Sequence, residues 1–217
     1  NNFSISVWFK TPDVTGGGAR QDLFATGAFG GAVAETFRIA LSAAGKIEFR
    51  STGTGWIDTF SSFTPVNDTW THVVYSVDRS GNAVWYGDAT TTQSLDISAN
   101  SINLSGAGIT GIAGGISVSK FEGLIADVAQ WDIALTAAQV QEYYDNSKGT
   151  PKLCANTALS TSPHLQGWWR FTNPSGTYNA VMANEGYGNA VNAGATVPYN
   201  FSMLNMDQSN VITDYPT

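Results

Sequence analysis

The sequence predicts an all-β fold in which two antiparallel sheets pack as a sandwich, with one short helix near residues 136–146. Three observations support this prediction. Segments in which every second residue is large and apolar recur along the chain, as in strands with one face on a core and the other toward water. Glycine-rich turns separate these segments, which favours antiparallel pairing. A helical pattern interrupts them once, between residues 136 and 144.

The first strand is predicted at residues 3–10 (FSISVWFK), where the odd positions are all large and apolar. Residues 36–41 (TFRIAL) repeat this alternation, and after a turn residues 46–50 (KIEFR) return along them as a hairpin. Residues 70–78 and 83–87 form a second predicted hairpin, joined by a loop that contains a glycine. The second face of such strands is expected to meet water.

The helix is predicted from its cap and its apolar face. Thr136 is a good N-cap, and Gln139 stands three residues later, which together make a capping box. Val140, Tyr143 and Tyr144 then fall on one face at helical spacing. A glycine and a proline follow and end the helix.

Composition excludes several classes of partner. The chain has 217 residues and a net charge of −7, and its ten basic residues are scattered along the sequence. Nucleic acids and membranes are therefore not expected as partners, because anionic phosphates require a concentrated basic face. No apolar run approaches the roughly 20 residues of a membrane span. Cys154 is the only cysteine, and the start at Asn1 suggests a fragment or processed product of a longer protein.

Three segments in register resemble the laminin-G/pentraxin branch of the concanavalin A-like superfamily. Residues 3–10 are similar to its F-S-I-S-x-W-x-K strand, and residues 69–75 (TWTHVVY) with 83–88 (AVWYGD) to its W-x-H-V and L-Y-V-D-G strands. Residues 121–136 (FEGLIADVAQWDIALT) are similar to its F-x-G-x-I-x-D-V-x-x-W-x-x-x-L-S motif. The resemblance covers roughly residues 1–148. It implies a jelly-roll sandwich whose concave face and rim loops carry ligands.

The C-terminal part carries a motif that such domains usually place first. Residues 165–171 (LQGWWRF) are similar to the L-x-G-Y-W-x-F strand that opens them, and residues 184–190 (NEGYGNA) to the loop that follows. We therefore expect a single permuted domain over residues 1–217, in which segment 165–217 supplies a strand and an extended tail. The alternative is a second domain that begins at residue 165 and is cut short.

Within this C-terminal strand, Trp169 and Phe171 share one face, which we expect to be buried against the core. Trp168 and Arg170 should face the other way. The arrangement resembles laminin-G-like virion proteins of tailed phages. This resemblance implies a virion or extracellular location within a larger assembly.

The carboxylates do not form the pattern of a catalytic pair. The superfamily includes glucanases, which carry two carboxyl groups on one strand as E-x-D-x-x-E, and no such pattern occurs here. Glu122, Asp127 and Asp132 are five residues apart, so successive members fall on opposite faces of a strand. Neither His72 nor His164 lies in a nucleophile motif. We therefore expect no catalytic residue and no enzyme activity.

Calcium is not expected as a cofactor. Ca²⁺ takes six to eight oxygen ligands, and pentraxins supply them from a loop just before the strand that matches residues 121–128. Here residues 113–120 contain no carboxylate. We predict no metal site, although a loop site built from Asp58, Asp78 or Asp88 stays open as an alternative.

The best candidate for a ligand site is a loop at residues 53–58 (GTGWID), where Trp56 supplies an aromatic platform and Asp58 a hydrogen-bonding side chain. Alternatively, Trp56 covers the edge of the core or contacts a protein. The whole sequence favours a non-enzymatic structural or adhesion module, a capsid decoration, tail or fibre protein of a phage virion. Its partners would be other structural protein subunits or host glycans. A calcium-dependent carbohydrate-binding lectin and a glycan hydrolase are the two alternatives.

Overall fold

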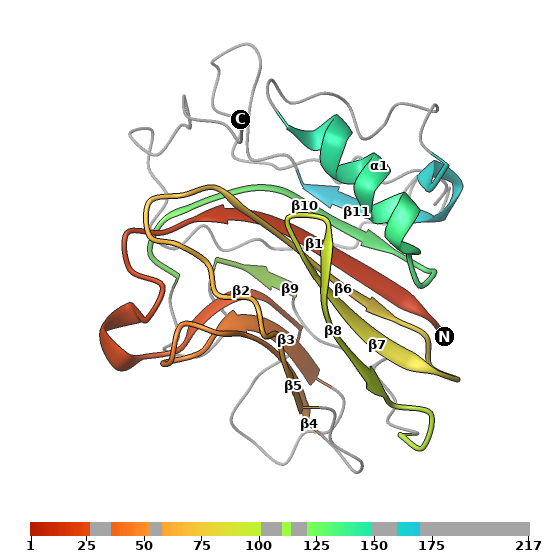
Figure 1. The fold of residues 1–217 in the computed structure, drawn as a ribbon, viewed down its shortest axis with the longest axis horizontal. Coiled ribbons are helices and arrows are strands. Elements are labelled where there is room, and N and C mark those ends of the chain that lie inside the picture. Colours follow the sequence, from red (N-terminus) through yellow and green to blue (C-terminus); the bar gives the residue numbers. More distant parts are fainter. Residues whose placement is uncertain (27–35, 53–57, 101–109, 114–120, 149–159, 170–217) are drawn as a thin grey trace, which may run out of the picture.

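The computed structural model describes residues 1–26, 36–52, 58–100, 110–113, 121–148 and 160–169. Within these ranges the chain forms two antiparallel sheets that lie one above the other, with one α-helix on the outside (Figure 1). The predicted fold class, a two-sheet jelly-roll sandwich with a single short helix, is confirmed. None of the described helices combines the length and apolar character needed to cross a membrane.

Each sheet joins strands that are distant in the sequence. From one edge to the other, the six-stranded sheet contains β11 (Leu165–Trp169), β10 (Leu124–Trp131), β1 (Phe3–Lys10), β6 (Thr71–Val77), β7 (Asn82–Gly87) and β8 (Thr90–Asp96). The five-stranded sheet contains, in spatial order, β5 (Asp58–Phe60), β4 (Ile47–Thr52), β3 (Thr36–Leu41), β2 (Gln21–Thr26) and β9 (Thr110–Ile112). Helix α1 (Ala137–Ser147) follows β10, and two short 3-10 turns are η1 (Gly16–Gly18) and η2 (Ser162–His164).

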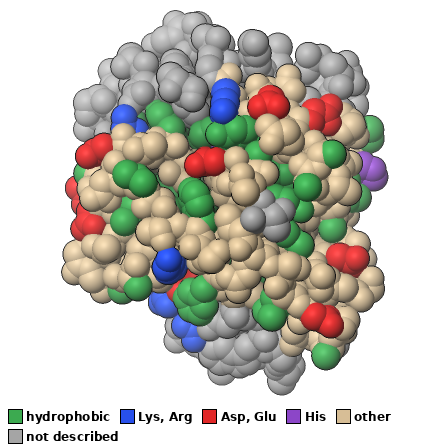
Figure 2. Space-filling view, viewed as in Figure 1, with side chains coloured by type: hydrophobic (Ala, Val, Ile, Leu, Met, Phe, Trp, Pro, Cys, Tyr) green, Lys and Arg blue, Asp and Glu red, His purple; other side chains and the backbone are tan. Residues whose placement is uncertain are grey.

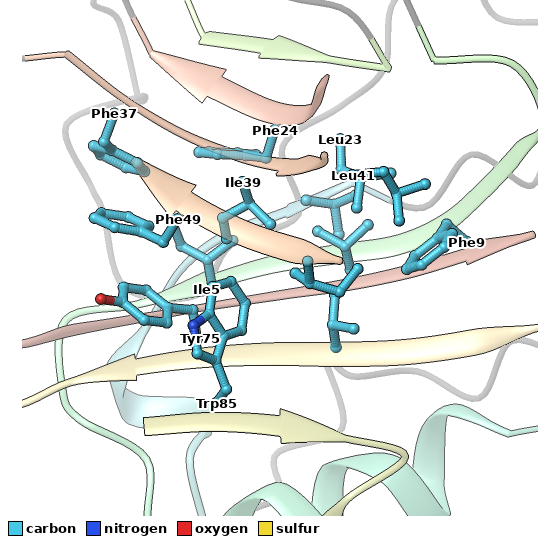
Figure 3. Close-up of a cluster of buried hydrophobic side chains, with 14 of the residues drawn as sticks. Ile5, Phe9, Leu23, Phe24, Phe37, Ile39, Leu41, Phe49, Tyr75 and Trp85 are labelled. Atoms are coloured by element: carbon cyan, nitrogen blue, oxygen red, sulfur yellow. The ribbon is translucent and has the colours of Figure 1, made fainter. Parts of the chain in front are cut away.

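The main core lies between the two sheets and is built from the alternate residues that the sequence pattern selects. Ile5, Val7 and Phe9 of β1 are at most 1% exposed, and they meet the inward residues of β3 and β4. Aromatic rings dominate the contact: Phe49 of β4 stacks on Tyr75 of β6 with ring centroids 4.2 Å apart (Figure 3). Burial of each such side chain contributes roughly 1.5–3 kcal/mol.

A polar link inside this core ties the edge strand β5 to the opposite sheet. The Tyr75 hydroxyl and the Trp85 indole N–H both lie 3.1 Å from Thr59 Oγ1, and all three side chains are buried. Because buried polar groups are stabilised only when they are paired, these hydrogen bonds fix the position of Thr59. Strand β5 is therefore linked to both sheets, through its pairing with β4 and through Thr59, which directly precedes Phe60 in the strand.

The second face of β1 does not meet water, contrary to the expectation from its alternation. Ser4, Ser6 and Trp8 are at most 2% exposed, because α1 and the segment that leads into it from β10 cover this face. Ser4 Oγ donates to the Ile133 carbonyl at 2.8 Å and accepts from the Leu135 N–H at 2.9 Å. The serines thus supply the hydrogen bonds that the covering segment needs.

Helix α1 packs on the outer surface of the six-stranded sheet through a second apolar cluster. The cluster contains Val74, Tyr86, Ala129, Trp131, Leu135, Val140, Tyr143 and Leu165. The predicted capping box is present: Thr136 accepts from the Gln139 N–H, and the Gln139 side chain accepts from the Thr136 N–H. Val140 and Tyr143 are buried, and Tyr144 stacks on Trp8 with ring centroids 5.4 Å apart.

Strand β11 is the edge strand beside β10 and brings part of the C-terminal region onto the sheet. Leu165 is 1% exposed and lies in the second cluster, and the Cα of Trp169 pairs with that of Val128. The side chains of Trp168 and Trp169, and the predicted core residue Phe171, lie outside what the structure describes. The single domain over residues 1–217 therefore stays a prediction.

His72 of β6 is the one fully buried histidine in the described ranges. Its ring stacks on Trp8 at 4.8 Å and lies against Tyr143 and Tyr144 of α1, and its Nε2 is 2.7 Å from Ser6 Oγ. Burial, with a smaller contribution from Lys148, lowers the pKa of His72 from 6.5 to about 3. The imidazole is therefore neutral in the folded protein.

We expect the stability of the protein to fall on mild acidification because of His72. The unfolded chain takes up this proton near pH 6.5, whereas the folded chain does not until the pH approaches about 3. The free energy of unfolding should therefore drop as pH falls, by roughly 2 kcal/mol between pH 6.5 and 5. Urea unfolding at pH 7, 6 and 5 measures this slope. A His72→Gln variant should lose this dependence of the free energy of unfolding on pH, whereas the control variant His164→Gln, changed at an exposed histidine, should keep it. The same dependence in the parent and in His72→Gln would contradict its assignment to His72.

We also expect β11 to be needed for a stable domain. A chain that ends at residue 148 lacks Leu165, whose removal alone typically costs about 2–5 kcal/mol of a total stability near 5–15 kcal/mol. It also leaves β10 as an unpaired edge. Thermal melting of this fragment should be broad, while a matched chain that ends at residue 169 and keeps β11 should melt cooperatively. A fragment of residues 1–148 that melts as sharply as the full chain would show that β11 is dispensable.

Candidate functional site

Charged side chains line the surface of the five-stranded sheet that is turned away from the core. On β3, Phe37 and Ile39 point into the core, so Arg38 between them points outward. On β4 the same alternation turns Glu48 and Arg50 outward, and Arg38 lies directly opposite Arg50. The surface of a sheet that should meet water thus carries a row of long charged side chains.

The neighbouring strands extend this row. Asp22 of β2 pairs with Ala40 of β3, which in turn pairs with Glu48 of β4. Phe60 of the edge strand β5 pairs with Glu48 on its other side. Directly opposite residues in antiparallel strands share a face, so all these side chains lie on one surface. We call it the outer face; its members in the strands are Asp22, Arg38, Glu48, Arg50 and Phe60. We add Arg20, which contacts Glu48, and Lys46, which directly precedes β4 in the same alternation as Glu48 and Arg50.

Two buried carboxylates and two arginines form an ion-pair network on the outer face. Arg20 contacts Glu48 through Nε and through Nη2, the latter at 3.4 Å from Oε2. Arg38 lies 3.7 Å from Glu48 through Nε and 3.9 Å from Asp22 through Nη1. The side chains of Glu48 and Asp22 are only 1% and 0% exposed. Buried carboxylates require such pairing, because an isolated charge in the interior is strongly unfavourable.

The guanidinium of Arg38 is the centre of this network, and neighbouring groups shift its pKa in opposite directions. Burial lowers its pKa from the ordinary value, and the nearby charges of Arg20 and Arg50 act in the same direction. Asp22 and Glu48 oppose them and raise it. Like charges directly opposite each other in a sheet are unfavourable. Arg38 is therefore held by its carboxylates against repulsion from two other arginines.

The network corrects two expectations from the sequence. The outward side chains Asp22, Arg38 and Glu48 were expected in water but are buried. The basic residues, scattered in the sequence, gather in part: Arg20, Arg38, Lys46 and Arg50 all belong to the outer face. The sequence of the hairpin at residues 36–50 contains a signal for this gathering of charge, because charged residues alternate there with apolar ones. Alternation alone indicates which residues enter the core, and it leaves the pairing of the outward charges open.

Phe60 adds an aromatic ring to the outer face. Its side chain is 45% exposed, and within the described ranges large apolar side chains this exposed are few. It lies beside the buried Glu48, and Thr59 next to it is fixed by hydrogen bonds to the opposite sheet. An exposed ring next to hydrogen-bonding groups is the combination that sugar binding requires, because a sugar ring has apolar faces and polar edges.

The predicted ligand residues lie next to this face or outside the described ranges. Trp56 is not among the residues that the structure describes. Asp58 begins β5 and its Cα pairs with that of Arg50, while its side chain is not described. Of the predicted pair, Asp58 thus lies in β5, the strand that carries Phe60, and Trp56 precedes that strand in the sequence.

The alternative calcium ligands are not gathered by the fold. The Asp78 carboxylate accepts from Ser80 in a turn, which lowers its pKa. Asp88 accepts from the backbone N–H of His72, and burial raises its pKa. Across the described part of the chain, no three His, Cys, Asp or Glu side chains come together as a metal site would require.

The groups considered for catalysis are also separated. Glu122 precedes β10 and Asp132 follows it, so they lie at opposite ends of one strand. Asp127 between them is buried at a β-bulge, with a left-handed φ of 44°. Ser6 and His72 have the separation of a nucleophile and a base, but both are fully buried beneath α1. A substrate cannot reach them.

Known families and structures share this architecture. The family model Laminin_G_3, described as Concanavalin A-like lectin/glucanases superfamily, matches residues 1–141. No curated protein sequence matches the chain. A candidate carbohydrate-binding protein from Bacteroides ovatus ATCC 8483 is similar with a TM-score of 0.59 at 14% identity, over 85% of this chain and 49% of that one.

Two further solved structures are similar over about two thirds of this chain. The receptor-binding domain of botulinum neurotoxin mosaic serotype C/D has a TM-score of 0.51 at 16% identity, covering 66% of this chain and 36% of that one. Domain 4 of AbnA, a GH43 extracellular arabinanase from Geobacillus stearothermophilus solved with arabinotriose, has a TM-score of 0.51 at 22% identity, covering 65% and 66%. The chain spans about half of the first structure and about a third of the second. At these identities the similarities show the fold alone.

We expect Arg38 to be essential for the stability of the outer face. An Arg38→Met variant keeps the length of the side chain but removes the charge, leaving the buried Asp22 carboxylate without its arginine. Loss of one partner of a buried ion pair typically costs about 3–5 kcal/mol. Urea unfolding of this variant and of a double variant that adds Asp22→Asn measures the effect. The double variant should recover much of the loss; an Arg38→Met variant within about 0.5 kcal/mol of the parent would contradict the network.

Proposed function

The chain belongs to the concanavalin A-like lectin/glucanases superfamily, and we propose that it is a non-catalytic module that binds glycans through the outer face of its five-stranded sheet. The observation that carries this proposal is the exposed ring of Phe60, on the residue directly opposite Glu48, which is ion-paired with Arg20. The opposite surface of the sandwich is covered by α1. Asp22, Arg38 and Glu48 at the centre of the outer face are buried, so its exposed members Phe60 and Arg20 are the groups that a ligand would contact.

The chemistry of the outer face suits a sugar. The Phe60 ring offers an apolar surface for the C–H groups of a pyranose. Arg20 contacts Glu48 through Nε and Nη2, so the remaining N–H groups of its guanidinium are left to donate elsewhere. Its side chain is 31% exposed, which brings these donors to the surface. An aromatic platform with a fixed fork of donors beside it can orient a sugar by its hydroxyl groups.

A hydrolase needs different carboxyl groups. A glycosidase uses one carboxyl as a proton donor, which must hold its proton at the working pH. The two carboxylates of the outer face, Asp22 and Glu48, are instead buried and contacted by arginines. Both carboxylates are enclosed in the sheet surface and already contacted by arginines, so neither is placed to reach the glycosidic oxygen of a substrate. We therefore propose binding without cleavage.

The proposed setting is the one that the sequence predicts, a virion or another extracellular assembly in which the module also contacts protein neighbours. The low share of charged residues, 12% of the chain, supports a surface dominated by hydroxyl and amide groups. Figure 2 shows a face on which the charged side chains are scattered among hydrophobic and other side chains. The location stays a prediction.

We expect Phe60→Ala to abolish glycan binding without unfolding the protein. The side chain is exposed, so its removal should change stability by less than about 0.5 kcal/mol. Affinity for a glycan selected on a printed array should fall at least about tenfold in calorimetric titration. Phe60→Tyr keeps the platform and should bind, as should Val66→Ala, which removes an exposed apolar side chain outside the outer face.

Two results would overturn the proposal. One is a parent protein that binds no glycan on the array, or a Phe60→Ala variant that binds as tightly as the parent. The other is the release of reducing sugar from a bound glycan, lost in Glu48→Gln, which would make the protein a hydrolase.

A further inference from the structure

The charge of the outer face is opposite in sign to that of the remaining chain. Four of the ten basic residues belong to it, against two described acidic side chains, Asp22 and Glu48. Asp58 of β5 pairs with Arg50, and counting it gives three acidic residues on the outer face. Six basic and fourteen acidic residues are then left, which gives the rest of the chain a charge of −8, within a total of −7. The outer face is a positive area on an acidic protein.

The two carboxylates of the network are already occupied, so they do not neutralise all of this charge. Glu48 is shared between Arg20 and Arg38, and Asp22 pairs with Arg38. Lys46 is different: its Nζ donates to Thr64 Oγ1 at 2.5 Å and to the Ser62 carbonyl at 3.5 Å, both uncharged groups. The ammonium of Lys46 is thus a cation on the outer face whose hydrogen bonds go to neutral oxygens.

The cross-strand register adds a second observation. Arg38 and Arg50 lie directly opposite each other, an arrangement that is unfavourable for like charges. Burial is the largest cause that lowers the pKa of Arg38, and the charges of Arg20 and Arg50 act in the same direction while Asp22 and Glu48 oppose them. An anion bound beside the partly exposed Arg20 would add negative charge at the accessible end of this row.

We infer that the glycan bound at the outer face carries an anionic substituent, a carboxylate or a sulfate, which Arg20 and Lys46 recognise beside the Phe60 platform. This inference rests on the proposed function, since it names the class of glycan that the same face takes. Guanidinium forks match the geometry of carboxylate and sulfate oxygens, and they bind such groups through paired hydrogen bonds. The acidic remainder of the chain repels the same ligand everywhere else, which confines it to this face.

The test uses matched glycans that differ only in charge. A printed array should display each neutral backbone beside its uronic-acid form and its O-sulfated form, and the full chain should be applied at low and high salt. We expect the anionic forms to bind at least about tenfold more tightly than the neutral backbone at about 50 mM NaCl. The difference should shrink at about 500 mM NaCl, because salt screens exposed charges. Comparison of the uronic-acid and sulfated forms identifies which anion is preferred.

Variants assign the selectivity to the outer face. Lys46→Gln should reduce the ratio of anionic to neutral binding severalfold, while Lys10→Gln, which removes the same charge from β1 of the other sheet, should leave the ratio unchanged. Equal affinity for neutral and anionic forms, with binding still lost in Phe60→Ala, would overturn this inference and leave glycan binding intact. An equal effect of the two lysine variants would also overturn it. Binding to no glycan of any class would overturn the proposed function and this inference together.

Discussion

The burial of both faces of strand β1 is the constraint on which the rest of the structure depends. One face supplies Ile5, Val7 and Phe9 to the main core, and the other supplies Ser4, Ser6 and Trp8 to the layer beneath α1. Polar side chains in such a position must be hydrogen-bonded, because an unpaired buried polar group is costly. Ser4 meets the chain before α1, and Trp8 donates to Ser147 at the end of the helix at 2.8 Å. The helix is thus fixed at both ends by the first strand.

This covering makes the two surfaces of the sandwich unequal. The outer surface of the six-stranded sheet is sealed by α1 and by an aromatic layer around His72. The five-stranded sheet keeps its charged outer face, where the buried side chains are ion-paired charged groups instead of apolar ones. Ion pairing stabilises these buried charges, and the N–H groups of the arginines that lie outside the pairs stay polar.

Local patterns predicted the parts of the structure that depend on near neighbours. The inward set of β1 follows from alternation, and the capping box of Thr136 and Gln139 from a spacing of three residues. Contacts between distant residues were not visible in this way. Asp22 and Glu48 meet the same arginine only because β2, β3 and β4 pair in one register, with a bulge after Asp22. The burial of Ser6 and Trp8 required a helix more than 120 residues away.

The central place of β1 also governs how the protein is made. Trp8 and Ser147, which share a hydrogen bond, are 139 residues apart in the chain. At a synthesis rate of about 5–20 residues per second, roughly 7–28 s pass between the emergence of the first and the second. During that interval strand β1 has β6 as a partner but lacks β10 and α1. Topologies of high contact order fold slowly for this reason, and a nascent chain of this kind is exposed to aggregation until its last strands leave the ribosome.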